Sequence, residues 1–264
     1  MSLSLHPDVQ SIHDRIPTVA LKIKPLVKNT PLLHSAYYSD LTGANVFFKY
    51  ENLQTTGSFK MRGASAKLIG TSKETLKDGI VTASTGNHGK AVAFAAQSLG
   101  VTPTIYAPKG TDPFKIAAIT KLGGKLIFAG SDCVETESIA IEHADKNKAT
   151  YVAPYNDPEV IAGQGTLGLE IASQLGSIDA VFLSVGGGGL AAGRLRARAG
   201  ELRARGLPQR AGLEERQAAR LHAHRLPLQG HPHRWHGIRL VVQAWPARHL
   251  RAQPGHQGLD GSHA

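Results

Sequence analysis

The stretch GIVTASTGNHGKAVAFAAQSLG, residues 79–100, places an apolar run, a polar turn and a helical pattern one after another. The run GIVTAS is short and rich in β-branched residues, which is typical of a buried strand. The turn STGNHG, residues 84–89, carries small polar side chains and offers free backbone N–H groups at the positive end of the helix. It can therefore bind a carboxylate or a phosphate. The alternative is a capped turn with Asn87 and His88 on the surface.

The same alternation continues along the chain. Four further apolar runs predict strands at residues 102–108, 125–130, 150–154 and 179–186. The segments between them have the spacing of apolar residues that is typical of helices. Alternating strands and helices of this kind imply a mostly parallel sheet with helices on both faces.

A second motif, ENLQTTGSFKMRGA at residues 51–64, places Lys60 after a Thr-Gly-Ser turn and at the start of a predicted helix. A lysine held on a rigid turn can form an imine with an aldehyde cofactor. The alternative is an ordinary exposed lysine. We interpret Arg62 as a solvated helix residue rather than a site residue.

Four consecutive glycines, residues 186–189, follow the last apolar run. Four glycines in a row increase the entropy lost on ordering a loop, but they allow close backbone approach and direct several amides at one anion. The sequence GGGGL matches neither the dinucleotide-binding nor the P-loop pattern. A phosphate-binding loop is therefore favoured over a flexible linker.

The net charge of +10 is unevenly distributed over the 264 residues. Residues 1–193 carry 15 Lys and 2 Arg against 16 acidic residues, a net charge of +1. Residues 194–264 carry 13 Arg against 4 acidic residues, a net charge of +9. The single cysteine, Cys133, excludes an internal disulfide. With no recognisable signal peptide or membrane-length apolar run, we expect a cytoplasmic chain that does not enter a membrane.

The sequence changes character after Gly193. Lys, Asn, Thr, Tyr, Phe and Met are absent from residues 194–264, and no period-2 strand is recognisable there. The residues that dominate share C/G-rich codons, so we interpret this Arg/His/Pro-rich tail as aberrant, read out of frame. One alternative is a basic extension that binds nucleic acid. Another is a metal site, although ligand spacing is lacking among the histidines concerned: His222, His224, His231, His233 and His236.

Four motifs together resemble the fold-type-II pyridoxal-phosphate enzymes, in the branch of threonine/serine dehydratases and serine racemases. Residues from about 10 to 193 carry the resemblance, through SFKMRGA, STGNHG, AGQGT and GGGGL in the order of the family. It implies an α/β fold similar to tryptophan synthase β, with two three-layer α/β domains. Residues 49–149 would form a small mobile domain. Residues 1–48 and 150–193 would form part of the large pyridoxal-phosphate-binding domain, whose second half is missing.

The resemblance also implies roles for single residues. Lys60 would bind the aldehyde of pyridoxal 5′-phosphate and later take the substrate's α-proton, with Phe59 packed beside the cofactor ring. Asn87 would hydrogen-bond the cofactor's 3′-oxygen. The phosphate would lie on the amides of Gly186, Gly187, Gly188 and Gly189. The substrate carboxylate would lie among Ser84, Thr85, Gly86, Asn87 and His88, and Ser84 and Thr85 would join Lys60 as catalytic residues.

The implied reaction is β-elimination of water from L-threonine or L-serine, giving a 2-oxo acid and ammonia. Thr85 stands where racemases of this branch tend to have a second serine and dehydratases often have alanine. Its hydroxyl is restricted by the β-branch, so we favour elimination over racemisation. A dehydratase of ectoine catabolism is a further alternative, because STGNHG resembles that group too.

Parts of the family pattern are missing after Gly193. The resemblance implies a divalent-cation site and a polar residue facing the pyridine nitrogen, and neither is recognisable in residues 194–264. We therefore predict no metal site in this chain, poor folding and little activity. The alternative to an enzyme is a non-catalytic remnant or a basic binding protein. An intact family member is expected to be a homodimer acting on a small amino acid.

Overall fold

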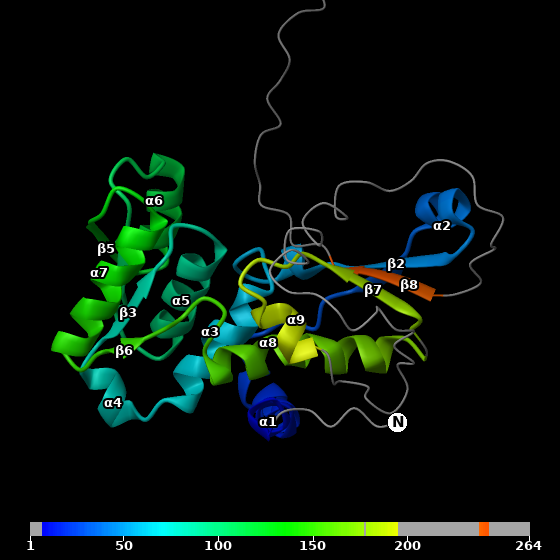
Figure 1. The fold of residues 1–264 in the computed structure, drawn as a ribbon, viewed down its shortest axis with the longest axis horizontal. Coiled ribbons are helices and arrows are strands. Elements are labelled where there is room, and N and C mark those ends of the chain that lie inside the picture. The colour runs from blue at the N-terminus through cyan, green and yellow to red at the C-terminus, as the bar shows by residue number, and fades with distance from the viewer. Residues whose placement is uncertain (1–6, 177, 195–237, 243–264) are drawn as a thin grey trace, which may run out of the picture.

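The computed structural model describes residues 7–176, 178–194 and 238–242 (Figure 1). Its elements are, in chain order, α1 (Pro7–Ile23), β1 (Leu32–His34), α2 (Ala36–Thr42), β2 (Asn45–Lys49), the 3-10 helix η1 (Glu51–Leu53), α3 (Lys60–Gly70), α4 (Lys73–Lys77), β3 (Ile80–Ala83), α5 (Asn87–Ser98), β4 (Thr104–Ala107), α6 (Pro113–Lys121), β5 (Lys125–Phe128), α7 (Cys133–Lys146), β6 (Thr150–Tyr151), α8 (Pro158–Gln174), β7 (Ala180–Leu183), α9 (Gly189–Arg194) and β8 (Ile238–Val242). Within these residues, no helix combines the length and the apolar character that a membrane crossing needs.

Sheet B, on the left in Figure 1, contains β5, β4, β3 and β6 in that order, and every strand pair in it is parallel. Neighbouring residues of β4 face opposite sides, as strand geometry requires. Ile105 packs against Ala93 of α5 and Ile119 of α6. Tyr106 packs against Ala140 of α7. Helices therefore cover both faces of this sheet, and the four strands predicted between residues 79 and 154 are all confirmed.

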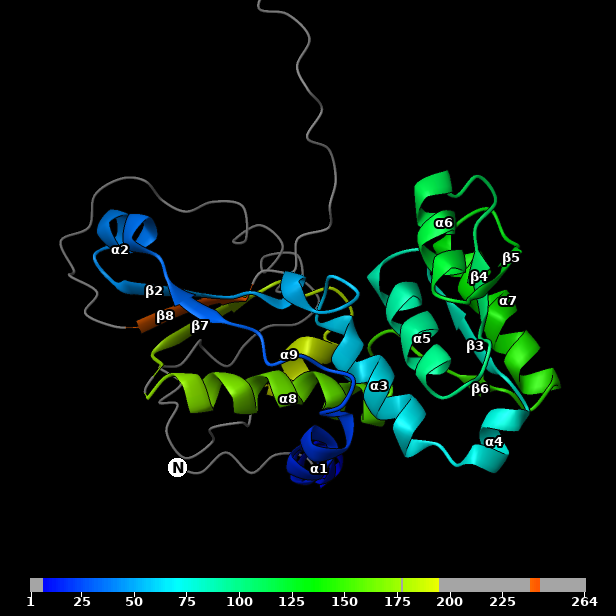
Figure 2. The ribbon, with the colours of Figure 1, turned by 180° about the vertical axis from the view of Figure 1, so that it is seen from behind.

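Sheet A has the order β1-β2-β8-β7, with β1 antiparallel to β2 and the other pairs parallel. One face packs on α8 and α9, where Leu167 and Leu190 lie against Val181 and Leu183 of β7. On β7, Phe182 between them stays 49 % exposed. Among the described helices, α8 and α9 lie along one face of sheet A (Figure 2), and the exposure of Phe182 indicates that β7 is less covered on the opposite face.

Strand β8 was not expected from the sequence. It lies between β2 and β7 and runs parallel to both, with Asn45 opposite Ile238 and Ala180 opposite Arg239. The prediction that no strand follows Gly193 is therefore wrong for residues 238–242. The other expectations for the tail, its histidine cluster included, lie outside the described residues.

The strands near the expected lobe boundaries at 48/49 and 149/150 can be placed in the two sheets. Lys49 is the last residue of β2 in sheet A, and Thr150 and Tyr151 of β6 pair with Ile80 and Val81 in sheet B. Residues 150–151 form a short strand parallel to β3. Sheet B therefore extends two residues beyond the expected boundary at 149/150. The division of the chain into two domains stays a prediction.

Helices α3 and α8 form the contact between the two sheets (Figures 1 and 2). Their backbones approach closely because glycines face each other: a Cβ on Gly163 would lie 2.5 Å from the Arg62 carbonyl oxygen and 2.7 Å from the Gly63 Cα. Helix α3 begins at Lys60, and α8 begins just after residues 152–157. The crossing of the two helices therefore fixes the position of Lys60 relative to residues 152–157.

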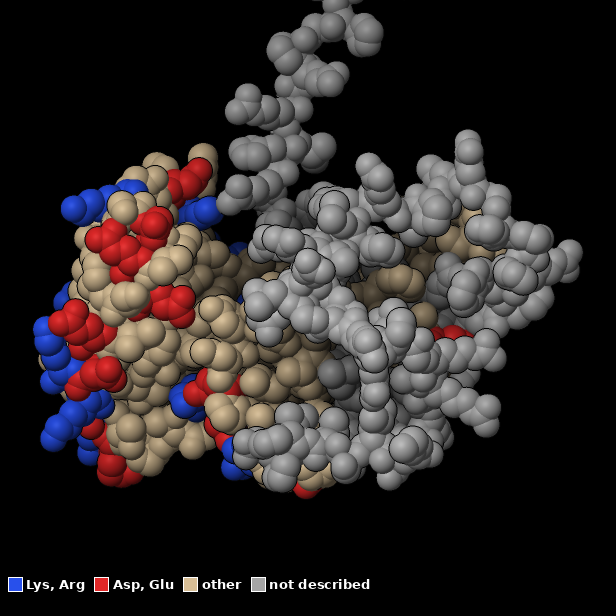
Figure 3. All heavy atoms as spheres, viewed as in Figure 1, with Lys and Arg blue, Asp and Glu red and all other residues tan. Residues whose placement is uncertain are grey.

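The surface of the sheet B lobe carries charges of both signs (Figure 3). Acidic and basic side chains alternate across the face drawn there, in agreement with the net charge of +1 over residues 1–193. A nucleic-acid interface calls for clustered positive charge. The described part of this face has no such cluster.

Candidate active site

Lys60 is a half-buried amine at the first residue of α3. Its Nζ donates a hydrogen bond to the Pro154 carbonyl oxygen at 2.6 Å and lies 5.4 Å from the centre of the Phe59 ring. No carboxylate pairs with it among the described residues. Loss of hydration on burial lowers the pKa of Lys60. A partly dehydrated amine without an acidic partner is a suitable nucleophile for an aldehyde.

The STGNHG turn joins β3 to α5, as predicted. Close approach of its ends requires Gly89, because a Cβ there would lie 2.1 Å from the Ser84 carbonyl oxygen. The Ser84 hydroxyl accepts a hydrogen bond from the Gly86 N–H at 3.3 Å. Ser84, Thr85 and Asn87 are partly exposed, and the first-turn N–H groups of α5 lack partners within the helix. This turn can therefore receive an anion.

The side chain of His88 does not lie on the surface of the turn, where the capped-turn alternative placed it. This side chain is buried, and its Nε2 lies 3.0 Å from the Val152 carbonyl oxygen. Since a carbonyl only accepts, Nε2 carries the proton in this contact. Burial lowers the pKa of His88 to about 4, although the Val152 hydrogen bond opposes this and the Lys60 charge adds to it. The imidazole thus ties the turn to residue 152, and only the backbone N–H of His88 remains available to a carboxylate.

The glycine loop, residues 186–189, lies over Tyr155. A Cβ on Gly187 would lie 2.1 Å from the Tyr155 ring, and one on Gly189 would lie 2.5 Å from the Tyr155 carbonyl oxygen. Gly188 adopts a φ of +86°, which L-residues rarely adopt. Gly186 and Gly188 have no atom within 4 Å of an added Cβ. The loop is therefore packed on one side and open on the other, a shape that suits a bound phosphate.

One segment contacts all three predicted motifs: residues 152–156, between β6 and α8, called here the β6–α8 loop. Its Pro154 carbonyl accepts from Lys60, its Val152 carbonyl accepts from His88, and Tyr155 packs under Gly187. Sequence reasoning missed this loop. The available signal was its position at the carboxyl end of the strand predicted at residues 150–154, because functional loops of parallel sheets lie at that end.

These residues fit pyridoxal phosphate. Lys60 supplies an amine without an acidic partner, Phe59 supplies an apolar face beside it, and the glycine loop supplies an open set of amides. The residue that the resemblance implies opposite the pyridine nitrogen is not recognisable in residues 194–264, most of which lie outside the described residues. Among the residues the structure covers, no group of three His, Cys, Asp or Glu side chains could hold a metal ion.

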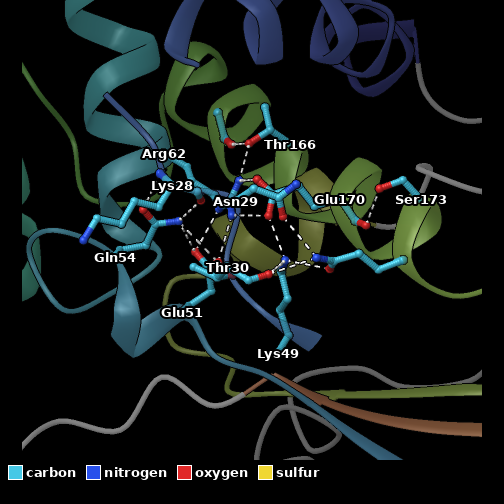
Figure 4. A network of polar contacts seen from close by, with 12 residues as sticks. Lys28, Asn29, Thr30, Lys49, Glu51, Gln54, Arg62, Thr166, Glu170 and Ser173 are labelled. Atoms are coloured by element: carbon cyan, nitrogen blue, oxygen red, sulfur yellow. Dashed lines mark hydrogen bonds and ion pairs between the residues drawn. The ribbon is translucent and has the colours of Figure 1, made fainter. Parts of the chain in front are cut away.

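Arg62 lies close to this site but is not solvated, so its interpretation as a surface residue is wrong. Its guanidinium is 1 % exposed and makes paired hydrogen bonds of 2.8 Å to both Glu51 and Glu170 (Figure 4). It also donates to the Thr166 hydroxyl at 3.2 Å. The physical reason is the α3–α8 crossing, which turns position 62 toward α8.

Lys49 completes a buried charge network with Arg62, Glu51 and Glu170. Its Nζ donates to Glu170 at 2.7 Å and to the Thr30 carbonyl oxygen at 2.7 Å. Burial lowers the pKa of Lys49, and the contact with Glu170 opposes this only partly. Burial alone would also lower the pKa of Arg62, but the hydrogen bonds and charges of Glu51 and Glu170 outweigh it and raise that pKa. Two cations therefore face two carboxylates, and the charges of the network cancel.

Comparison with known proteins gives one matching family. The sequence pattern of a family described as pyridoxal-phosphate-dependent enzymes matches residues 23–255, a range that continues past Gly193. An L-threonine ammonia-lyase of Geobacter sulfurreducens is 40 % identical over 172 residues, which cover 65 % of this chain and 43 % of that protein. A catabolic L-threonine dehydratase of Staphylococcus aureus is 45 % identical and is covered to 50 %. The chain thus spans about half the length of the curated relatives it matches.

Solved structures give the same result. Processed threonine deaminase isoform 2 of Solanum lycopersicum has a TM-score of 0.69 and 38 % identity, with 72 % of this chain and 52 % of that chain covered. Maize serine racemase has a TM-score of 0.66 and 33 % identity, with 69 % of this chain and 55 % of that chain covered. Both similarities support the fold of the same family.

Proposed function

This chain belongs to the family of pyridoxal-phosphate-dependent enzymes, and we propose that its described residues form the site of an amino-acid ammonia-lyase for L-threonine or L-serine. The observation that carries the proposal is the convergence of Lys60, the STGNHG turn and the glycine loop on the β6–α8 loop. The similarity to threonine ammonia-lyases and dehydratases supports the reaction type.

Lys60 has two tasks in this proposal. Its neutral amine would hold the cofactor at the aldehyde, and its Nζ would later be the base that takes the α-proton of the substrate. Burial lowers the pKa of Lys60, so a larger fraction of the amine is neutral at a given pH. Pyridoxal phosphate, when bound, supplies the aldehyde and a ring that delocalises the electrons left on the α-carbon. The β-hydroxyl leaves as water, and hydrolysis then yields the 2-oxo acid and ammonia.

The anions are held at two places. The amides of residues 186–189 bind the phosphate, and the STGNHG turn binds the substrate carboxylate through the Ser84 and Thr85 hydroxyls and the first-turn N–H groups of α5. Asn87 lies at the start of the same helix, where its amide can meet the 3′-oxygen of the cofactor. The cofactor's phosphate would thus lie at the glycine loop, and the substrate's carboxylate would lie at the STGNHG turn.

Racemisation is the second candidate. The similarity to maize serine racemase and the hydroxyl of Thr85 favour it. A racemase needs a second proton-transfer group on the ring face opposite Lys60. Thr85→Ala would remove racemisation and retain elimination at a raised KM, because one hydroxyl at the carboxylate is lost, whereas Thr85→Ser would retain both reactions. Chiral chromatography of serine after incubation measures the first reaction, and 2-oxo acid formation measures the second.

The first test concerns Lys60. The purified chain is incubated with pyridoxal phosphate, reduced with borohydride and digested, and the modified peptide is identified by mass spectrometry. We expect the adduct on Lys60 in the parent chain and in Lys77→Ala, a control at an exposed lysine of α4, but not in Lys60→Ala. Equal labelling of several exposed lysines would contradict the proposal.

Turnover is a separate measurement. We propose that residues 194–264 are read out of frame, so the chain forms the Lys60 adduct but produces little 2-oxobutyrate from L-threonine. A chain in which another reading frame supplies the expected second half of the large domain after Gly193 should restore turnover. An adduct without turnover in both versions would identify a non-catalytic remnant. We also propose that the intact protein is a homodimer, as the family resemblance implies.

A further inference from the structure

We propose that Tyr155 is a positioning residue for the glycine loop: its ring holds residues 186–189 in the shape that binds the cofactor's phosphate. The inference rests on the proposed function and deepens it. Tyr155 belongs to none of the four motifs that point to the family, and it contacts two of the four glycines of the loop.

The contact is close enough to define the loop. A Cβ on Gly187 would lie 2.1, 2.3 and 2.5 Å from three carbons of the Tyr155 ring, so the ring lies directly against the Gly187 backbone. At Gly189 the nearest atoms are the Tyr155 carbonyl oxygen at 2.5 Å and its Cα at 3.0 Å. Residue 155 therefore supports the loop with its side chain at one glycine and with its backbone at another.

The support itself is fixed at both ends. Before Tyr155, the Val152 carbonyl accepts from the Thr82 hydroxyl at 2.8 Å and from His88 at 3.0 Å. After Tyr155, Asp157 caps α8 by accepting from the Glu159 N–H at 2.8 Å, and it pairs with Lys67 at 2.6 Å. These contacts leave little freedom to the residues between them. The ring is thus a rigid surface for a loop that is intrinsically flexible.

A rigid support matters because four glycines lose much conformational entropy when they become ordered. A loop that is already ordered before binding does not lose this entropy when the phosphate arrives, so affinity increases. Gly186 and Gly188 remain open on their own sides, with nothing within 4 Å of an added Cβ. Tyr155 therefore supports the loop without filling the space around those two glycines.

The same loop also sets the position of the reacting amine. The residue before Tyr155, Pro154, accepts the hydrogen bond of Lys60 Nζ at 2.6 Å. Two adjacent residues thus fix the amine and the phosphate loop, which are the two ends that one cofactor molecule must reach. Positioning of this kind is sensitive to small displacements, and a shift of about 1 Å can reduce function roughly a hundredfold.

The test compares pyridoxal phosphate with pyridoxal, which lacks the phosphate. Apparent dissociation constants are measured by absorbance titration of the full chain and of three variants: Tyr155→Ala, Tyr155→Phe and Tyr37→Ala, a control tyrosine of α2 that is 72 % exposed. We expect Tyr155→Ala to weaken pyridoxal phosphate roughly tenfold to a hundredfold and to leave pyridoxal unchanged. Tyr155→Phe retains the ring and should bind like the parent, as should Tyr37→Ala.

The possible outcomes separate the two proposals. If the parent binds neither compound, the proposed function fails and this inference fails with it. If the parent binds pyridoxal phosphate but Tyr155→Ala binds it equally well or more tightly, only the role of Tyr155 is wrong. An equal loss for both compounds in Tyr155→Ala would indicate general disruption and also overturn it.

A double-mutant cycle provides a second readout. Gly187→Ala places a methyl group against the Tyr155 ring and should weaken pyridoxal phosphate by itself. In Gly187→Ala/Tyr155→Ala that collision is absent, so the combined loss should be smaller than the product of the two single losses. Independent effects of the two substitutions would overturn the proposed contact.

Discussion

The buried charge network and the loops around Lys60 are neighbours on α3 but differ in how their polar groups are paired. In the network, Arg62 makes hydrogen bonds to two carboxylates and Lys49 makes them to one carboxylate and two amide-type oxygens. At the site, the described contact of Lys60 is a single neutral carbonyl. Two cations located two residues apart on one helix therefore have opposite surroundings.

The pKa directions follow from this difference. Hydrogen bonds and charges of Glu51 and Glu170 outweigh burial and raise the pKa of Arg62, whereas burial without an acidic partner lowers the pKa of Lys60. A fully paired cation stabilises a fold junction and cannot take part in proton transfer. A cation without an acidic partner remains available for chemistry. For Arg62 and Lys60 the pairing state, rather than burial alone, decides the direction of the pKa shift, whereas burial still lowers the pKa of Lys49 despite its pair with Glu170.

Arg62→Met should have the largest effect on stability, because it removes the cation that pairs with both carboxylates of the buried charge network. It leaves the buried carboxylates of Glu51 and Glu170 without their main partner, which typically destabilises a protein by about 3–5 kcal/mol. Urea unfolding followed by circular dichroism measures the change. Lys67→Met is the control on the same helix: its pair with Asp157 is partly exposed, so we expect at most about 1 kcal/mol. Equal losses in the two variants would remove the distinction.

The second-largest expected effect is a pH dependence of the free energy of unfolding, which arises from His88 near the candidate active site. Burial lowers the pKa of His88 from 6.5 to about 4, so the unfolded chain binds a proton more readily between these values. The free energy of unfolding should therefore decrease as pH falls from 6.5 towards 4, by roughly 3 kcal/mol. Above pH 6.5 this group contributes no pH dependence. His88→Gln cannot titrate, and a parent slope equal to that of the variant would contradict the prediction.

The smallest effect concerns the shape of the loops rather than charge. Gly89→Ala places a methyl group 2.1 Å from the Ser84 carbonyl oxygen and should destabilise the chain by about 1–3 kcal/mol. Gly86→Ala is the matched control in the same turn, because the nearest atom to its added Cβ is the Ser84 hydroxyl at 4.0 Å. Thermal unfolding of the two variants measures the difference. A larger loss in Gly86→Ala would show that the turn is not held by this close approach.

Local patterns were sufficient to predict sheet B and the positions of the motifs. Each strand is short and β-branched, and each turn uses small residues whose geometry depends on nearby atoms only, as at Gly89 and Ser84. Lys60, the STGNHG turn and the glycine loop each contact the β6–α8 loop. The strands and turns themselves are encoded within a few residues of where they occur.

Contacts between distant segments could not be predicted in the same way. Arg62 and Glu170 are 108 positions apart, and nothing near Arg62 indicates that α8 will lie against it. The role of Tyr155 depends on Gly187 of another strand–helix connection. Strand β8 depends on β2 and β7, which provide its parallel partners on both sides. To predict these three contacts, one must know how the helices cross or in which order the strands lie. A local sequence pattern does not contain that information.

The central position of β8 has a consequence for synthesis on the ribosome. The strands of sheet B follow one another closely in the sequence, so this sheet can form as soon as residue 151 has emerged. Sheet A cannot close until residue 242 has emerged, because among the described strands β2 and β7 are joined through β8. Non-local pairings of this kind form slowly and leave strand edges open in the meantime. During translation of residues 184–237, β2 and β7 are therefore open to pairing with other nascent chains.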